Sequence, residues 1–171
     1  MKVNDGFTVV ELLVTVSIVA VLLGLAVPSF RDLFERQRLE TVADTIMSDL
    51  RAARAEAISR GPEDALRVEF TTASSSWSYT ITDTSDTVYL QRSSDDLYGA
   101  SVVMTIANTA FGDADLDGKR DFSLDALRGL ALDGAGTITL TSSSGYAISV
   151  VRNLLGKIDL CSDSMSGYSA C

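Results

Sequence analysis

The side chains able to carry chemistry gather in a few short stretches of this 171-residue chain. They are a lone Glu11 in an apolar run, an Asp-rich segment at 112–121, the cations Arg152 and Lys157, and the cysteines Cys161 and Cys171. The chain has no His, so the commonest general base and zinc ligand are missing. No spacing singles out a carboxylate or serine mechanism instead. We therefore expect a protein that is not an enzyme.

The Asp-rich segment reads GDADLDGKRD. Carboxylates at alternate positions, with Gly at the sixth, resemble the start of an EF-hand calcium loop, with Asp113, Asp115, Asp117 and Asp121 as oxygen ligands. The twelfth position is Leu124 instead of Glu. The alternative is a surface turn in which Asp and Gly provide local hydrogen bonds. Calcium is thus the one cofactor that the sequence suggests.

Cys161 and Cys171 enclose nine residues that are rich in Ser and Gly. A disulfide between them would close a short terminal loop and would indicate an oxidising compartment outside the cytosol. Two free thiols are the alternative.

Residues 7–30 form an apolar run whose only charge is Glu11. As a helix, these residues would reach roughly 36 Å, enough to cross the ~30 Å hydrocarbon core of a bilayer. A cleaved secretory signal fits less well, because the leader sets Lys2 against two acidic residues and no small-x-small cleavage site follows. A carboxylate inside a membrane helix needs a cationic partner. A cut between Gly6 and Phe7 would create one, an α-amino group about one helical turn away.

The run Gly6-Phe7-Thr8-Val9-Val10-Glu11 resembles the class III signal of type IV pilins and type II secretion pseudopilins. The resemblance implies that a prepilin peptidase cuts after Gly6 and methylates the new amino-terminal Phe7. It implies that Glu11 pairs with an adjacent subunit during assembly. It also implies that Pro28 accompanies a bend or a melted stretch of the helix. Residues 1–6 are then a leader peptide, and residues 7–30 a transmembrane and filament-core helix.

Residues 31–61 continue as an amphipathic helix. Between Arg31 and Arg60 there are six basic and six acidic residues. The apolar positions follow steps of three and four, which places them on one stripe of a helix: Leu39, Val42, Ile46, Leu50, Ala53 and Ala57. Gly61-Pro62 ends the helix. The segment RAARAEAISRG at 51–61 is similar to the corresponding part of the GspH/FimT group of pseudopilins and minor pilins.

Residues 62–171 predict a β-rich head, because short runs of Val, Ile, Thr, Tyr and Phe alternate with Ser, Asp and Gly clusters. We expect strands near 66–71, 76–82, 87–92, 101–108, 137–141, 146–151 and 154–160. Alternation such as Trp77, Tyr79 and Ile81 favours a half-buried antiparallel sheet. The expected fold class is α+β, a long helix with a membrane-spanning half and an amphipathic half, packed on a C-terminal antiparallel head.

Charge disfavours DNA as a partner. The formal net charge is −9, and residues 61–171 alone hold 7 basic and 15 acidic side chains, which repel a phosphate backbone. The DNA-binding FimT proteins have a Gly-Arg-x-Arg motif near the closing strands, where this chain has Gly156-Lys157-Ile158-Asp159. Asp159 stands in place of the second cation. Arg152 and Lys157 remain the candidate phosphate contacts, with a solvated strand face as the alternative.

The resemblance implies a minor pilin that takes part in assembling a type IV pilus for twitching, adhesion or DNA uptake. Its partners would be other pilins or pseudopilins, the prepilin peptidase, and the inner membrane with its assembly platform. It would cross the inner membrane once, with its head in the periplasm, before entering a pilus or pseudopilus. A type II secretion pseudopilin and a DNA-uptake receptor at a pilus tip are the alternatives.

Overall fold

The computed structural model describes residues 7–61, 65–73, 76–97, 101–107, 120–124, 135–153 and 155–171, with the side chains of 25–29, 107 and 120–123 outside the description. The chain divides into two compact units, Met1–Phe34 and Glu35–Cys171. One helix, α1 (Val9–Arg60), contributes to both units. Each unit is described by itself below.

The first unit contains the N-terminal part of α1. Thr8 caps the helix, because its Oγ1 accepts a hydrogen bond from the Glu11 N–H at 3.2 Å. The hydroxyls of Thr15 and Ser17 donate to the carbonyls of Leu12 and Leu13 at 2.9 and 2.7 Å. The hydroxyl groups of Thr15 and Ser17 are therefore satisfied by the helix itself.

The second unit holds α1 from Glu35 to its end. The predicted apolar stripe is confirmed, since all six of its residues are buried, together with Ala43. The helix ends at Gly61, whose φ of 91° lies in the left-handed region. That conformation is easy for Gly and is the usual way to stop a helix.

The first of two antiparallel sheets has the strand order β3-β2-β1-β5. Its strands are β1 (Leu66–Thr72), β2 (Trp77–Thr82), β3 (Val88–Ser93) and β5 (Arg120–Leu124). The inward side chains of β1 and β2 alternate, as the sequence predicts, and Tyr79 and Phe70 are among the largest fully buried ones.

The second sheet has the order β4-β6-β7-β8. Its strands are β4 (Val102–Ala107), β6 (Gly136–Ser142), β7 (Ala147–Arg152) and β8 (Ile158–Cys161). Ile138, Leu140 and Ile148 place the core on one face, because side chains alternate along each strand.

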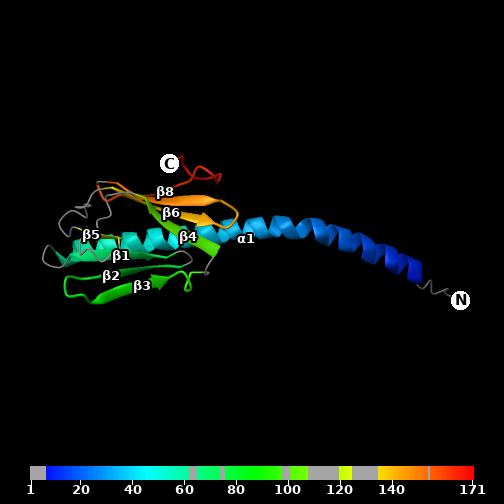
Figure 1. The fold of residues 1–171 in the computed structure, drawn as a ribbon, viewed down its shortest axis with the longest axis horizontal. Coiled ribbons are helices and arrows are strands. Elements are labelled where there is room, and N and C mark those ends of the chain that lie inside the picture. Colours follow the sequence, from blue (N-terminus) through cyan, green and yellow to red (C-terminus); the bar gives the residue numbers. More distant parts are fainter. Residues whose placement is uncertain are drawn as a thin grey trace. The chain divides into compact units, whose positions relative to one another are not determined.

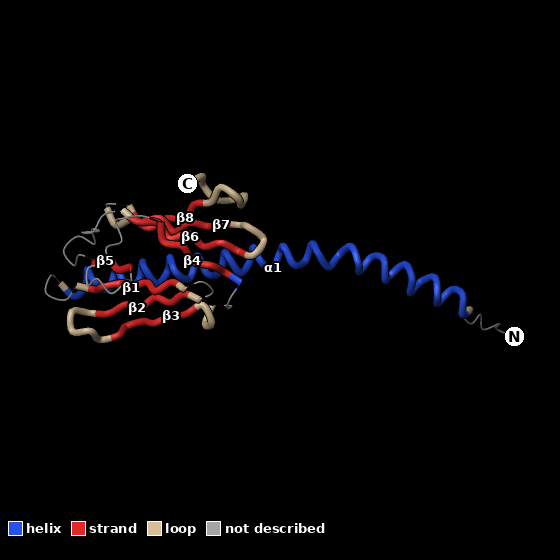
Figure 2. Tube along the Cα trace, viewed as in Figure 1, coloured by secondary structure: helices blue, strands red, loops and turns tan. Residues whose placement is uncertain are grey.

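One hydrophobic core joins α1 to both sheets. In Figure 1 the sheet that contains β6 and β8 lies above the C-terminal half of α1, and the sheet that contains β1, β2 and β3 lies below it. Figure 2 shows the same arrangement, with strands in red and the helix in blue. Trp77 also links the two sheets, since its Nε1–H donates to the Val102 carbonyl at 2.9 Å. The α+β prediction is confirmed.

Two strand predictions need correction. Strand β5 was not predicted, because its five residues follow the Asp-rich segment and show no extended alternation; pairing with β1, in which Leu66 faces Leu124, positions it. The predicted strand at 154–160 begins only at Ile158. Asn153 and Gly156 form a turn there, with Gly156 N–H donating to the Asn153 carbonyl at 2.9 Å and Gly156 at a φ of 71°.

The C-terminal loop is fastened to β8. The Cys161–Cys171 disulfide is present, with Cα atoms 5.1 Å apart, so the predicted bond is confirmed. The loop also packs inward through Met165, and an isolated bridge pairs Ser169 with Cys161 beside the sheet. The loop therefore covers the outer edge of β8.

Removal of this disulfide is expected to destabilise the head moderately. On the chain-entropy estimate, Cys171→Ser should lower the free energy of unfolding by roughly 2–3 kcal/mol. Urea unfolding of the whole chain in detergent, followed by the fluorescence of the buried Trp77, measures this. Ser166→Ala in the same loop is the matched control, and equal midpoints for the two variants would contradict the prediction.

Candidate functional site

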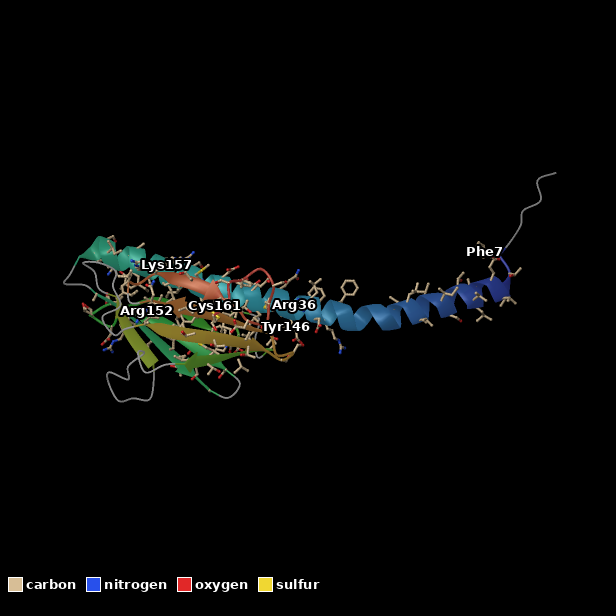
Figure 3. The ribbon with its side chains drawn as sticks, turned by 90° about the horizontal axis from the view of Figure 1, so that it is seen from above. Phe7, Arg36, Tyr146, Arg152, Lys157 and Cys161 are labelled. Carbon is tan, nitrogen blue, oxygen red and sulfur yellow. A yellow bond between two sulfur atoms is a disulfide. The ribbon has the colours of Figure 1, made fainter. Side chains whose placement is uncertain are left out.

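The N-terminal motif is presented at the start of α1. Phe7 is 79% exposed and immediately precedes the cap residue Thr8. Figure 3 shows Phe7 at the start of the helix. Glu11 is the third residue of the helix and follows Thr8 by three positions, which is the spacing of a capping box. Its negative charge also suits a helix N-terminus, where the backbone dipole is positive. Gly6, the predicted cleavage residue, lies outside the described residues.

The apolar side chains of residues 7–24 are exposed on every face of the helix, and most large ones exceed 50% exposure. A helix that is apolar all round requires burial in another apolar environment. α1 continues through residue 28, so a melted stretch at Pro28 is not present, and the Pro28 side chain lies outside the description.

The sequence predicts that residues 7–30 span the membrane. In the described part of the chain, no helix meets the length and hydropathy required for such a span.

At the start of the second unit, two adjacent helix residues hold the turn between β6 and β7. Arg36 donates to the Tyr146 hydroxyl at 2.7 Å and lies over the Tyr146 ring, 4.2 Å from its centre. The Glu35 carboxylate accepts from the Ser143 hydroxyl at 2.9 Å and from the Ser144 N–H at 3.0 Å. Figure 3 shows Arg36 and Tyr146 together where the helix meets the head. These contacts join the start of the helix in the second unit to the β6–β7 turn.

Acidic pH is expected to weaken this junction. Hydrogen bonds from Ser144 and Ser143 lower the pKa of Glu35. A carboxyl with a lowered folded-state pKa stabilises the fold above its unfolded pKa, and this contribution is lost as the pH falls through the folded pKa. The melting temperature of the head should therefore fall between about pH 5 and pH 3. Glu35→Gln should flatten that dependence in thermal melts, whereas Asp44→Asn, at an exposed position of the same helix, should not. Identical pH profiles of the two variants would count against the prediction.

Farther along α1, Asp49 connects the helix to the first sheet. Its carboxylate accepts from the Tyr79 hydroxyl at 2.7 Å and from the Arg92 Nε–H at 3.2 Å. Tyr79 is fully buried, and burial together with Asp49 raises its pKa. This trio holds polar groups of α1, β2 and β3 in one arrangement, and its role is structural.

The two cations that the sequence suggests as DNA contacts differ in their exposure to solvent. Arg152 at the end of β7 is only 2% exposed, so it is not a surface contact for a phosphate. Lys157 is exposed, and its Nζ lies 2.8 Å from the Asp159 carboxylate. Figure 3 shows Lys157 near the helix and Arg152 on the strands.

Two helix residues that the sequence did not indicate lie beside Lys157. The guanidinium of Arg51 donates to the Ile158 carbonyl at 2.8 Å, and that of Arg54 donates to the Leu155 carbonyl at 3.2 Å. Together with Lys157 they line a groove of about 340 Å³. The spacing of Arg51 and Arg54 placed them on one helix face, but nothing local predicted that the 155–158 turn would lie next to it.

The calcium prediction concerns residues that are mostly undescribed. Asp113, Asp115 and Asp117, and the side chain of Asp121, lie outside the described residues. The backbone of Asp121 belongs to β5 and pairs with Glu69, so residues 120–124, the last five positions of the EF-hand-like segment, form a strand. In the described part of the chain, no group of three or more His, Cys, Asp or Glu residues is placed to hold a metal.

Comparison with known proteins agrees with these features. Residues 42–156 match the family described as type II transport protein GspH, and residues 1–27 match the prokaryotic N-terminal methylation motif. Neither the curated proteins nor the solved structures gave a significant match. The GspH match covers the end of α1 and most of the head, and the methylation motif covers the apolar start. The chain belongs to the GspH family and is a pilin-like protein, a minor pilin or pseudopilin of the kind that prepilin peptidase processes.

Proposed function

We propose that this protein is a minor filament subunit in which the N-terminal helix packs into a filament and the β-rich head faces outward. The observation that carries the proposal is the exposed apolar start of α1, with Glu11 as its single charge after the cleavage position. Before assembly, residues 7–30 would hold the chain in the inner membrane with the head in the periplasm. The methylation motif supports a membrane anchor of this kind.

The proposed processing creates a cationic partner for the Glu11 carboxylate. Cleavage after Gly6 would leave Phe7 as a methylated amino terminus, whose positive charge lies close to the start of α1. In a filament, Glu11 of one subunit would neutralise the amino group of a neighbour. A buried charge without a partner is costly, so the pair would also penalise incorrect registers. Because Thr15 and Ser17 bond to their own helix, the remaining surface is free to pack on apolar neighbours.

The intact mass of the membrane-extracted protein tests the processing. We expect the loss of Met1–Gly6, one added methyl group, and a deficit of two hydrogens from the Cys161–Cys171 bond. Gly6→Leu is the matched variant that should remain uncut. A full-length, unmethylated wild-type chain would overturn the proposal.

Two filament systems remain candidates, a type IV pilus and the pseudopilus of type II secretion. The description of the matched family, a type II transport protein, favours the second. Deletion of the protein distinguishes them, because loss of surface pili with normal protein secretion identifies a pilus component. Loss of secretion with normal pili identifies a pseudopilin. A role as a DNA-uptake receptor receives less support, because Arg152 is buried and Lys157 forms an ion pair with Asp159.

A further inference from the structure

The groove between α1 and the β7–β8 turn combines positive charge with exposed apolar surface. We call it the basic groove and define it by Arg51, Arg54, Ile58, Lys157 and Ile158. Leu155 adjoins it, because its carbonyl accepts from Arg54. Ile58 is 49% exposed and Leu155 is 69% exposed. Within the described residues, Arg51 and Arg54 each donate one hydrogen bond to a turn carbonyl. Other N–H donors of each guanidinium remain for a partner, except the Nε of Arg54, which is buried.

This combination suits a carboxylate that lies beside an apolar side chain. The ion pair of Lys157 with Asp159 is solvent-exposed, with side chains 68% and 49% exposed. Replacing Asp159 by another carboxylate as the partner of Lys157 therefore costs little free energy. The phosphates of a nucleic acid would contact the cations but would make no use of the apolar side chains of Ile58 and Leu155. The acidic head would also repel the remainder of the nucleic acid. The groove chemistry therefore favours an acidic protein segment over DNA.

The chain itself presents such a segment at the turn between β2 and β3. Asp83 builds the turn, because its carboxylate accepts from the N–H groups of Ser85 and Thr87 at 2.8 and 2.9 Å. Asp86 sits at a φ of 59° and is exposed. Val88 follows at 54% exposure and Tyr89 at 42%. We call residues 83–89 the acidic turn.

Asp86 and Val88 are exposed in the acidic turn, and Arg67 is a cation that lines the same pocket as Asp83 and Asp86. Arg60 lies over the Tyr89 ring, 4.1 Å from its centre, and pairs with Glu56 at 2.8 Å. Asp83 is committed to its own turn. Asp86 and Val88 therefore offer the carboxylate and the apolar side chain that the basic groove would accept.

The two surfaces lie on opposite faces of α1, so one copy cannot bring them together. Helix residues 51, 54, 55 and 58 line the basic groove, whereas residues 49, 52, 53 and 56 line the pocket that contains Tyr89. Each member of one set is two positions from a member of the other, roughly 200° around the helix. Figure 1 likewise shows β8 and β3 on opposite sides of this part of α1.

We propose that the basic groove of one copy receives the acidic turn of a second copy. Such a contact joins two different surfaces, so it repeats from copy to copy without closing unless the rotation forms a ring. It would add a contact between heads to the packing of the apolar helices. This inference rests on the proposed filament function, in which many copies of the chain assemble side by side.

Cysteine cross-linking in membranes that contain the whole chain tests the contact. Cells would produce two tagged forms together, one with Val88→Cys and the other with Leu155→Cys. A mild oxidant should yield a dimer of the two forms in several-fold excess over either form linked to itself. Val103→Cys in place of Val88→Cys is the matched control, since Val103 is also exposed, at 44%, but lies on β4. A yield no higher than this control would overturn the proposal.

Charge variants test the chemistry. Asp86→Asn keeps a residue that tolerates the left-handed conformation, and Lys157→Gln keeps a side chain of similar reach. Each should reduce the cross-linked yield about threefold, the scale of one exposed ion pair. Unchanged yields in both variants would show that the charges do not recognise each other.

Two further readouts separate the possible failures. The intact mass of the same membrane sample reports processing: a processed chain without the 88–155 cross-link overturns the groove contact and leaves the filament proposal standing. An unprocessed chain that cross-links supports the contact and overturns the filament proposal. Retardation of double-stranded DNA by the whole chain, lost in Lys157→Gln and without any cross-link, would overturn the contact and identify the groove as a nucleic-acid surface.

Discussion

Glu11→Ala is expected to remove the protein from filaments. In the proposed assembly the variant leaves the amino group of a neighbouring Phe7 buried without a counter-charge. An uncompensated buried charge costs about 3–5 kcal/mol, which corresponds to roughly a hundredfold loss of incorporation or more. The measurement is the amount of protein in sheared filaments relative to the amount in the membrane, by quantitative immunoblot.

Glu11 also occupies the third position of a capped helix, so two variants separate charge from helix capping. Glu11→Gln retains an oxygen acceptor at the helix start but has no charge, and it should fail like Glu11→Ala. Thr8→Ala removes the Oγ1 that accepts from the Glu11 N–H and costs the helix about 1 kcal/mol, but it retains the charge. It should be incorporated nearly normally. Normal incorporation of Glu11→Gln would exclude the proposed pairing.

Ile46→Ala is expected to cause the largest loss of stability in the head. Ile46 is fully buried in the stripe by which α1 packs against both sheets. Truncation removes buried methyl groups and leaves a cavity, which together cost about 2–5 kcal/mol. Since small domains are stable by only about 5–15 kcal/mol, this is a large part of the total.

The unfolding of the Ile46→Ala variant can be followed through Trp77, the single Trp of the chain, which is buried in the same core. Urea titration of the whole chain in detergent should give a clearly lower midpoint. Ser48→Ala is the matched control two residues away on the exposed face, and it should change stability by no more than about 0.5 kcal/mol. If the two variants share one midpoint, the stripe does not hold the head together.

Local patterns predicted the elements well where periodicity was strong. The apolar stripe from Leu39 to Ala57 was predictable because one face of a helix must be apolar to pack on a sheet. Each residue of the stripe is buried in the structure. Alternation likewise predicted β1 and β2. The pairing of Cys161 with Cys171 was predictable because only two cysteines exist and they lie close together in the chain.

Patterns failed where pairing or burial depends on distant residues. Strand β5 exists because β1 provides its partner, and no residue within β5 itself indicates that. Arg152 was proposed as a surface cation, but it is 2% exposed. Because side chains alternate along a strand, a small error in the register of β7 would move a residue from one face to the other.

The sequence by itself determined the processing motif, the position of Glu11, the apolar helix and the α+β class, because each depends on residue type and on spacing within a few turns of chain. Only the tertiary structure decided which cations share a surface. Arg51 and Arg54 reach the turn that holds Lys157 across more than 100 positions of sequence, whereas strand β3, which begins at Val88, lies on the other side of the same helix. Such neighbours are set by how the sheets close around α1, through burial of a common core, and no local spacing encodes that closure.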